Sequence, residues 1–446
     1  MPTDVQLFAD GYHRRGGAGQ LRVTDPGTGR RLGVVELASE ADVRYALSVA
    51  HRAFPGWSAT PPAERGAVLK RAADTLLALA GRAASALVAE LGRTRAEARR
   101  EITRAIEELR HTGEQAVQLP AGARSFPAPL GVVAVVTPWY SPVVPAARHL
   151  AAAVAAGCPV VLNAAVNAPS AAALVVQALA EAGVPDGVVN LVFGDAPAVS
   201  EQLLRSPVVH AVAVSGPATA ARSLAEPAAR RLIRCVVDLD GHTPVLAGED
   251  ADPAAVVAVT GSAAFACAGQ SGAAPSRYLV PRDLHDAFAD ALSTFARSLQ
   301  LGSARDPATT LGPVAGPARL DTLVRSTGEL VARGARLATG GARADGKGFF
   351  FQPTVLAGVD PAAEVPFGPL VTVTPYDGFD EALSLVEAGG WVPAVALFTD
   401  SGARRERAVA MLPAGSIGIN RLPAEPPTTA RERILEFTRP RRVVIT

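Results

Sequence analysis

The stretch from Gly131 to Leu162 reads GVVAVVTPWYSPVVPAARHLAAAVAAGCPVVL and contains the clearest pattern of alternating strand and helix in the chain. The five residues after the glycine are β-branched or small and apolar, and a second short run of the same kind closes the stretch. Between them, residues 142–156 form an alanine-rich segment with the length and apolar content of a buried helix. A strand, a helix and a strand in this order predict two neighbouring parallel strands joined by a helix.

The same alternation continues along the chain. Residues 40–118 carry apolar positions at helical spacing and predict a helical segment ahead of the first strand. The other expected helices are 170–182, 253–268, 283–299, 317–333 and 379–387, and the other expected strands are 188–192, 208–214, 278–280, 371–374, 394–398 and 416–419. We therefore predict an α/β fold with a Rossmann-type parallel sheet domain followed by a second α/β domain.

The end of the chain differs from the rest. Residues 434–438 and 442–445 are rich in β-forming residues and follow a proline-rich connector, so we expect extended strands there. An extended tail commonly pairs with another element or another subunit. The predicted organisation is residues 1–118 and 132–240 in the first domain, 241–422 in the second, and 119–131 with 431–446 in a small β arm.

The overall composition is that of a globular protein without a strong electrostatic field. The 446 residues are 49% hydrophobic and 19% charged, and a formal net charge of +1 gives no global attraction to nucleic acid or an anionic membrane. The N-terminus lacks the pattern of a secretory signal, so we expect a cytoplasmic protein. Cys158, Cys235 and Cys267 are far apart and form neither a disulfide framework nor a metal-binding pattern. The expected partner is a small molecule or a protein.

Six segments resemble the aldehyde dehydrogenase superfamily in order and approximate spacing. They are Thr137–Pro142, Ala155–Asn163, Glu181–Val192, Phe351–Val355, Pro366–Pro369 and Ala414–Asn420. The resemblance covers most of the chain and implies the aldehyde dehydrogenase fold, with an NAD-binding first domain, a catalytic second domain and a β arm for oligomerisation. The connector before Pro129 is short for this family, so we expect a homodimer rather than a domain-swapped tetramer.

The nucleophile of this family is the cysteine of a G-Q-x-C motif, and that position is Gly272 here. Glycine has no side chain with which to attack a carbonyl. Two neighbouring residues are alternatives. Cys267 lies five residues earlier on a predicted helix, among apolar residues that raise the pKa of a thiol. Ser271 has no histidine near it in sequence to act as its base, which favours a loop-capping role for its hydroxyl.

The positions that hold the cofactor in this family have lost charged and polar groups. The ribose-binding lysine falls on Asn163, and the carboxylate three residues later falls on Val166. The turn that receives the pyrophosphate starts at Gly216 and continues with Pro217, which brings neither a hydroxyl nor an N–H group. The glutamate that binds the nicotinamide ribose falls on Val365.

Two aromatic residues of the family's cofactor site remain, Trp139 and Phe367. The loss of one charged hydrogen bond costs about 1.5–3 kcal/mol, so several such losses weaken NAD binding by orders of magnitude. We expect no tightly bound cofactor, with NAD or NADP held only weakly by Trp139, Asn163, Gly216 and Phe367.

The carbonyl side of the implied site keeps its polar groups. The family's oxyanion-binding asparagine is Tyr140 here, and a phenol can still donate a hydrogen bond. The general-base glutamate falls on Asp238. Asp240 replaces a glycine and His242 a lysine, which adds two titratable groups beside a position used for base chemistry. Each of these residues also fits a plain structural role in a strand end, a turn or an exposed loop.

Three hypotheses follow for the function. In the first, the protein has lost NAD-dependent aldehyde oxidation and performs non-redox acid/base chemistry on a small carbonyl or acyl compound. Tyr140 would polarise the carbonyl, and Asp238, helped by His242, would move the proton. In the second, the protein is a non-catalytic pseudoenzyme that binds a ligand or a partner subunit. In the third, a residual NAD(P)-dependent dehydrogenase uses Cys267 or Ser271.

Overall fold

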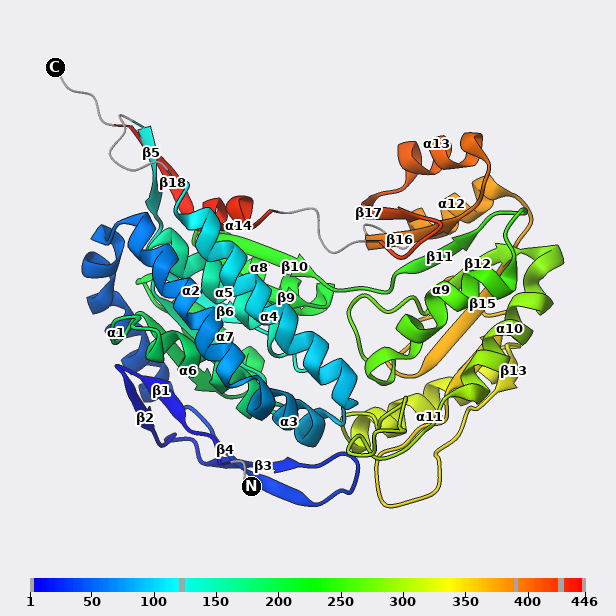
Figure 1. The fold of residues 1–446 in the computed structure, drawn as a ribbon, viewed down its shortest axis with the longest axis horizontal. Helices are drawn as coiled ribbons and strands as arrows, with labels where there is room; N and C mark the ends of the chain where they lie inside the picture. Colours follow the sequence, from blue (N-terminus) through cyan, green and yellow to red (C-terminus); the bar gives the residue numbers. More distant parts are fainter. Residues whose placement is uncertain (1–3, 120–124, 389–391, 424–428, 443–446) are drawn as a thin grey trace.

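A computed structural model of the chain describes residues 4–119, 125–388, 392–423 and 429–442. Figure 1 shows two lobes, each built around one sheet, with the chain crossing from the first to the second between β10 (Arg234–Leu239) and β11 (Pro244–Ala247). The first lobe contains a seven-stranded sheet in the order β10-β9-β6-β7-β8-β1-β2. Its strands from β10 to β8 run parallel, and β1 and β2 extend it antiparallel at one edge.

The remaining strands of this sheet are β1 (Leu7–Ala9), β2 (Tyr12–Arg14), β6 (Val132–Val136), β7 (Val160–Ala164), β8 (Val189–Phe193) and β9 (Val209–Gly216). The sequence predicted β6 residue for residue. Strands β6, β7 and β8 are buried at every position, as expected for a parallel sheet covered on both faces.

The helices of the first lobe start and stop where the sequence supplies caps. Ser39 with Asp42 and Thr94 with Glu97 form capping boxes that begin α1 and α4. Gly157 ends α5 with a φ of 92°, a left-handed conformation that favours glycine. These helices are α1 (Glu40–Ala59), α2 (Pro62–Ala78), α3 (Ala80–Leu91), α4 (Arg95–Ala116), α5 (Val144–Ala156), α6 (Pro169–Glu181), α7 (Ala196–Arg205) and α8 (Ala218–Arg230).

The second lobe contains another seven-stranded sheet, in the order β13-β14-β15-β12-β11-β16-β17, parallel except for the β13–β14 pair. Its other strands are β12 (Arg277–Pro281), β13 (Arg336–Thr339), β14 (Thr354–Ala357), β15 (Leu370–Tyr376), β16 (Val392–Phe398) and β17 (Ala414–Ile419). Its helices are α9 (Pro253–Phe265), α10 (His285–Ser298), α11 (Pro317–Ala332), α12 (Phe379–Ala388) and α13 (Gly402–Met411), with 3-10 turns η1 (Ala266–Gly269) and η2 (Arg282–Leu284). The predicted α/β fold with two parallel-sheet domains is therefore confirmed.

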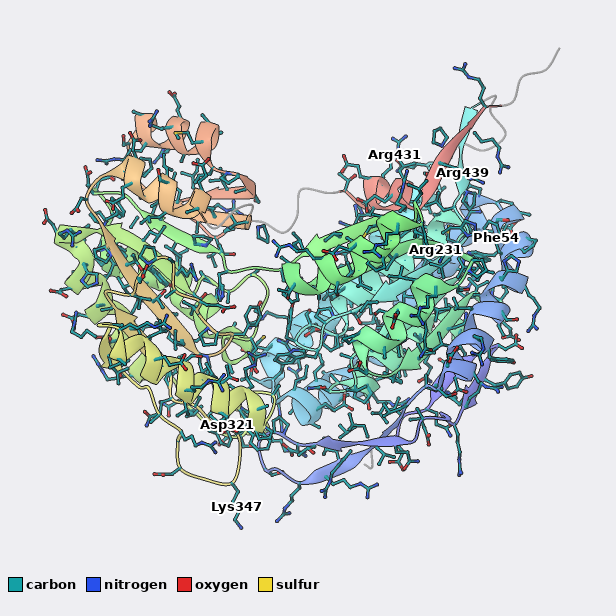
Figure 2. All side chains as sticks on the ribbon, turned by 180° about the vertical axis from the view of Figure 1, so that it is seen from behind. Phe54, Arg231, Asp321, Lys347, Arg431 and Arg439 are labelled. Atoms are coloured by element: carbon teal, nitrogen blue, oxygen red, sulfur yellow. The ribbon has the colours of Figure 1, made fainter. Side chains whose placement is uncertain are left out.

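Two antiparallel ribbons complete the fold, β3 (Gln20–Thr24) with β4 (Arg31–Glu36) and β5 (Ser125–Pro129) with β18 (Thr438–Arg442). The prediction of a strand at 434–437 is wrong, because helix α14 (Ala430–Glu436) occupies this segment. Thr429 and Glu432 form a capping box that starts this helix. Figure 2 labels exposed Arg431 on α14 and Arg439 on β18, close together at one end of the first lobe. The predicted strand residues 443–445 lie outside the described part of the chain.

In the described residues, no single helix is long and apolar enough to cross a membrane. Only α2 and α3 taken together, across a 63° bend, meet the criterion of length and composition. The same residues contain no group of three or more histidine, cysteine, aspartate or glutamate side chains placed to hold a metal ion.

Candidate functional site

A cavity of about 1080 Å³ opens between the two lobes, at the carboxyl ends of β6, β7 and β9. Parallel sheets commonly bind their ligands at this edge. Trp139, Asn163 and Phe367, predicted from the sequence as cofactor-binding residues, line the cavity. Gly216 is not a lining residue, although Ser215 and Pro217 on either side of it are.

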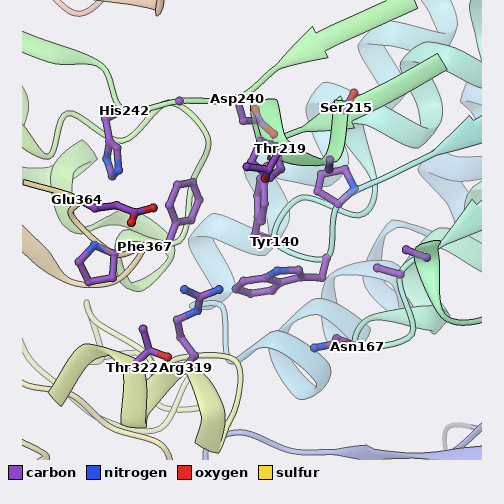
Figure 3. Close-up of a pocket in the computed structure, with 18 of the residues that line it drawn as sticks. Tyr140, Asn167, Ser215, Thr219, Asp240, His242, Arg319, Thr322, Glu364 and Phe367 are labelled. Atoms are coloured by element: carbon purple, nitrogen blue, oxygen red, sulfur yellow. Dashed lines mark hydrogen bonds between the residues drawn. The ribbon is translucent and has the colours of Figure 1, made fainter. Parts of the chain in front are cut away.

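One wall of the cavity is a chain of aromatic rings. The ring centroids of Trp139 and Tyr140 are 5.4 Å apart, those of Tyr140 and Phe367 are 5.2 Å apart, and those of Phe367 and His242 are 5.6 Å apart. Figure 3 shows Tyr140, Phe367 and His242 side by side in this wall. Successive rings are inclined by 86°, 51° and 62°, so they pack edge to face rather than forming one flat surface, and the wall joins residues of both lobes.

The polar centre of the site is the pair Tyr140 and Asp240. The Tyr140 hydroxyl donates a hydrogen bond to the carboxylate of Asp240. Burial raises the pKa of Tyr140 far above its ordinary value, and the neighbouring Asp240 charge raises it further. Burial also raises the pKa of Asp240 to about 6, against the lowering effect of the Tyr140 hydrogen bond. Asp240 can therefore exchange a proton near neutral pH, which suits acid/base chemistry.

The side chain of Asp240 occupies the space next to Gly272. A Cβ atom added to Gly272 would stand 2.1 Å from Oδ1 and 2.6 Å from Cβ of Asp240. The backbone holds Asp240 there, since its N–H donates to the Gly216 carbonyl at 2.9 Å and the N–H of Gly241 donates to the Gly272 carbonyl at 2.9 Å. A side chain at position 272 and Asp240 in this conformation exclude each other.

Sequence reasoning treated these two positions separately and missed their contact. The available signal was that both depart from the family motifs, glycine to aspartate at 240 and cysteine to glycine at 272. A bulky residue gained at one position and lost at the other is the pattern of two side chains that share one space.

Asp238, the predicted base, faces a different set of partners. Its Oδ2 accepts from Nη1 of Arg148 at 2.7 Å and from the Ser215 hydroxyl at 3.3 Å. It is not among the residues that line the cavity. The predicted partnership of Asp238 with Tyr140 differs from the structure, where Asp240 takes that place. Asp238 lies within β10 and pairs with Arg148, whereas Asp240 follows the last residue of the strand and accepts from Tyr140.

His242 lines the cavity, but both its ring nitrogens have partners. Nε2 donates to the Val365 carbonyl at 3.2 Å, and Nδ1 therefore accepts from the Ser276 hydroxyl. Burial, with the nearby Arg277 charge, lowers the pKa of His242 to about 4. The ring is neutral at physiological pH and serves to position the aromatic wall rather than to move protons.

Neither alternative nucleophile lines the cavity. Cys267 does not lie on the preceding helix as predicted, because α9 ends at Phe265 and Cys267 adopts a left-handed φ of 56° in the turn η1. Its thiol contacts Arg93, and burial raises its pKa to about 12, so little thiolate forms. The Ser271 hydroxyl accepts from the Ala273 N–H at 3.5 Å, a loop contact.

Two polar atoms at the edge of the first sheet lack partners. Buried Oδ1 of Asn163 and Oγ1 of Thr137 have no hydrogen-bond partner among the described residues, and α8 begins at Ala218 without a side-chain cap. Buried polar atoms are normally paired, but protein atoms cover these two, so a ligand in the cavity reaches them only if the side chains move.

The cavity has the volume for a dinucleotide, but the side chains at the expected binding positions suit this ligand less well. Val166 is half-buried and Val365 is buried, and neither offers an acceptor to a ribose hydroxyl. Glu364, next to Val365, lines the cavity beside His242 (Figure 3), where its charge faces Arg277. The cleft therefore has the volume for a dinucleotide, while valines stand at the two positions where the resemblance places carboxylates.

Sequence reasoning also missed the contribution of α11 to the site. Arg319, Thr322 and Arg325 of this helix line the cavity opposite the first sheet. The chain contains 43 lysine and arginine residues, and no local motif distinguishes these ones. Only the packing of the two lobes brings them to the cleft.

The burial of Asp240 makes stability depend on pH. This carboxyl has an ordinary pKa of 3.8 when unfolded and about 6 in the fold, so its contribution is present below about pH 4 and lost as the pH rises through about 6. Asp240→Asn cannot ionise, and we expect it to exceed the wild type in free energy of unfolding by about 1–3 kcal/mol at about pH 7.5 and to match it near pH 4. Urea unfolding at both pH values measures this, and an equal difference at both would contradict the assignment.

Comparison with known proteins gives one consistent result. The model of the aldehyde dehydrogenase family matches residues 13–431. The 4-(hydroxymethyl)benzenesulfonate dehydrogenase TsaD1 of Comamonas testosteroni is 36% identical over 430 residues, 93% of this chain and 90% of that protein. Human mitochondrial succinate-semialdehyde dehydrogenase is 29% identical over 421 residues, 90% of this chain and 79% of that protein. The crystal structure of Mycobacterium tuberculosis aldehyde dehydrogenase complexed with NAD+ matches with a TM-score of 0.92 at 28% identity, covering 100% of this chain and 99% of that chain.

Proposed function

Since the chain belongs to the aldehyde dehydrogenase family, we propose that it is a member that no longer oxidises aldehydes through a cysteine and instead performs non-redox acid/base chemistry on a small carbonyl or acyl compound. One observation carries this proposal. The carboxylate of Asp240, hydrogen-bonded to Tyr140, fills the space beside Gly272, the residue on which the family's nucleophile falls by the resemblance in the sequence.

The Tyr140 and Asp240 pair can carry out enolisation. Above about pH 6 Asp240 is a carboxylate and accepts a proton from the carbon next to the substrate carbonyl. The electron pair of that C–H bond moves toward the carbonyl oxygen. Once protonated, Asp240 no longer needs the single Tyr140 proton as its hydrogen-bond donor, and the Tyr140 hydroxyl turns to donate that proton in a hydrogen bond to the developing oxyanion. Asp240 then returns its proton to the same or a neighbouring atom. No oxidant or reductant takes part.

The proposal includes weak NAD(P) binding and no hydride transfer. Its support is the set of replaced contacts at Asn163, Val166, Pro217 and Val365, each of which removes a charged or hydrogen-bonding group that the family motif has. Against this, the relative from Mycobacterium tuberculosis carries NAD+ in its structure, and the cleft of this chain is wide enough for such a ligand. Binding measurements with both dinucleotides therefore belong in the test.

The experiment compares wild type with Asp240→Asn and Tyr140→Phe. Exchange of the hydrogen next to the carbonyl for solvent deuterium, followed by NMR for a panel of small aldehydes, ketones and acyl thioesters, reports enolisation without a coupled assay. We expect exchange by the wild type, a loss of about 10²-fold or more in Asp240→Asn and a smaller loss in Tyr140→Phe. NAD-dependent aldehyde oxidation by the wild type, or full exchange activity in Asp240→Asn, would overturn the proposal.

A second candidate function is that of a non-catalytic partner subunit. The observation that favours it is the ribbon of β5 and β18, which forms a two-stranded sheet separate from both large sheets in the described part of the chain. Such a ribbon can add to a sheet of another subunit, which would also build the predicted homodimer. Wild-type behaviour of both Asp240→Asn and Tyr140→Phe in every assay would favour this candidate.

A further inference from the structure

Arg319 is a half-buried cation at the cavity wall. Its guanidinium carbon lies 5.6 Å from the ring centroid of Trp139. Among the described residues no carboxylate forms an ion pair with it, and burial, the one influence on its pKa, lowers that pKa. A cation that is partly removed from water without a counter-charge is unfavourable, so the site is electrostatically incomplete.

The other arginines at the cavity are already engaged or exposed. Arg325 pairs with Glu329 one turn along α11 at 3.8 Å. Arg277 donates to the carbonyls of Pro361 at 3.3 Å and Ala363 at 2.7 Å. Arg319 thus differs from both in having a guanidinium that no protein acceptor in the described chain satisfies.

The position of Arg319 relates it to the reacting pair. The Trp139 ring that it covers is the neighbour of the Tyr140 ring, with centroids 5.4 Å apart. Figure 3 shows Arg319 reaching from α11 toward Tyr140 and Phe367, with Thr322 beside it. A ligand lying along Trp139 would therefore meet Arg319 at one end and Tyr140 with Asp240 at the other.

We propose that the cleft binds a small organic ligand through a carboxylate or sulfonate group, which Arg319 holds against Trp139. A guanidinium presents parallel N–H groups that match the oxygens of such an anion, and the aromatic face fixes its plane. The placement of a carbonyl at the opposite end rests on the proposed function. The anion site itself stands on Arg319 and Trp139 alone.

The test measures binding by calorimetry with 4-carboxybenzaldehyde and 4-sulfobenzaldehyde as organic anions, ATP as a phosphate source and benzaldehyde as the neutral match. Arg319→Met removes the charge, and Arg319→Lys keeps it without the planar fork. The control Arg222→Met removes the same charge from an exposed position on α8 that does not line the cavity.

We expect at least one of the two organic anions to bind the wild type and Arg222→Met alike, and to bind Arg319→Met about 10- to 100-fold more weakly. Arg319→Lys should fall between them, and benzaldehyde should bind wild type and Arg319→Met equally. Binding of ATP but of neither organic anion would identify a cofactor phosphate site instead and overturn the proposal. Equal affinity of the organic anions for wild type and Arg319→Met, or no binding of either to the wild type, would overturn it as well.

The two proposals fail separately in this design. Asp240→Asn should lose deuterium exchange and still bind the anionic probe, whereas Arg319→Met should lose affinity for the probe. If Asp240→Asn keeps its exchange activity while Arg319→Met loses binding, the anion site stands without the proposed chemistry. If binding is independent of Arg319 while Asp240→Asn is inactive, the chemistry stands without the anion site.

Discussion

Gly272→Cys is expected to restore no NAD-dependent aldehyde oxidation and to destabilise the fold by about 1–3 kcal/mol. The backbone is not the obstacle, because Gly272 lies outside the left-handed region. The obstacle is Asp240, whose Cβ and Oδ1 stand 2.6 and 2.1 Å from the Cβ that the substitution adds. Thermal unfolding and an NADH absorbance assay with a panel of aldehydes measure the two effects.

The matched control keeps the new cysteine and removes the Asp240 side chain that obstructs it. In the double variant Asp240→Gly with Gly272→Cys, the thiol has the space that the carboxylate leaves, so stability should return toward that of Asp240→Gly alone and the thiol should react with a maleimide reagent. NAD-dependent oxidation should still be absent, because the cofactor contacts at Val166 and Val365 are unchanged. Oxidation of aldehydes by Gly272→Cys alone would show that the cofactor site is better than its residues indicate.

Arg148→Met is expected to cost about 3–5 kcal/mol in free energy of unfolding. Arg148 is 8% exposed and bridges two carboxylates, Glu108 at 2.9 Å and Asp238 at 2.7 Å. Removing it takes one positive partner from each acid in a place with little water, and Asp238 loses the guanidinium that lies 2.7 Å away. Glu108 also accepts from Arg433 of α14 at 2.7 Å, so the same change should loosen the packing of the C-terminal helix. Urea unfolding followed by circular dichroism measures the loss.

An exposed ion pair provides the reference for the free energy of unfolding lost in Arg148→Met. Arg110 pairs with Asp74 at 3.0 Å, with 44% and 70% of the two side chains exposed, and Arg110→Met should cost less than about 1 kcal/mol. A double-mutant cycle with Asp238→Asn isolates the coupling between Arg148 and Asp238. A cost for Arg148→Met as small as that for Arg110→Met would mean that the buried network adds nothing to stability.

The sequence predicted the framework of the fold well because its signals are local. These signals include the apolar run of β6, Gly157 after α5, and Pro61 with Pro62 at the start of α2. Each acts on residues close to it in the sequence, and the structure has a strand or a helix boundary at each of these places. The error at α14 has the same origin. Its residues have mixed preferences, and the capping box of Thr429 and Glu432 outweighed the β-forming residues that follow.

The candidate site was less predictable because it depends on contacts between distant segments. Family motifs identified Tyr140, Asp240 and Gly272 one at a time, but the hydrogen bond from Tyr140 to Asp240 spans 100 residues. Arg319 reaches the cleft only through the packing of α11 against the other lobe. Spacing in the sequence carries no information on such contacts. The sequence therefore assigned the base to Asp238, whereas the base that we propose from the structure is Asp240, two residues later.

The contact between Asp240 and Gly272 also constrains the order in which substitutions at the two positions can occur. An aspartate at 240 cannot enter the fold while a side chain stands at 272, and a cysteine cannot return to 272 while the aspartate remains. A side chain at position 272 must therefore leave before Asp240 enters, or together with that change. With Asp240 in place, no single substitution at position 272 adds a side chain without displacing Asp240, so a side chain returns to position 272 only through changes at both positions.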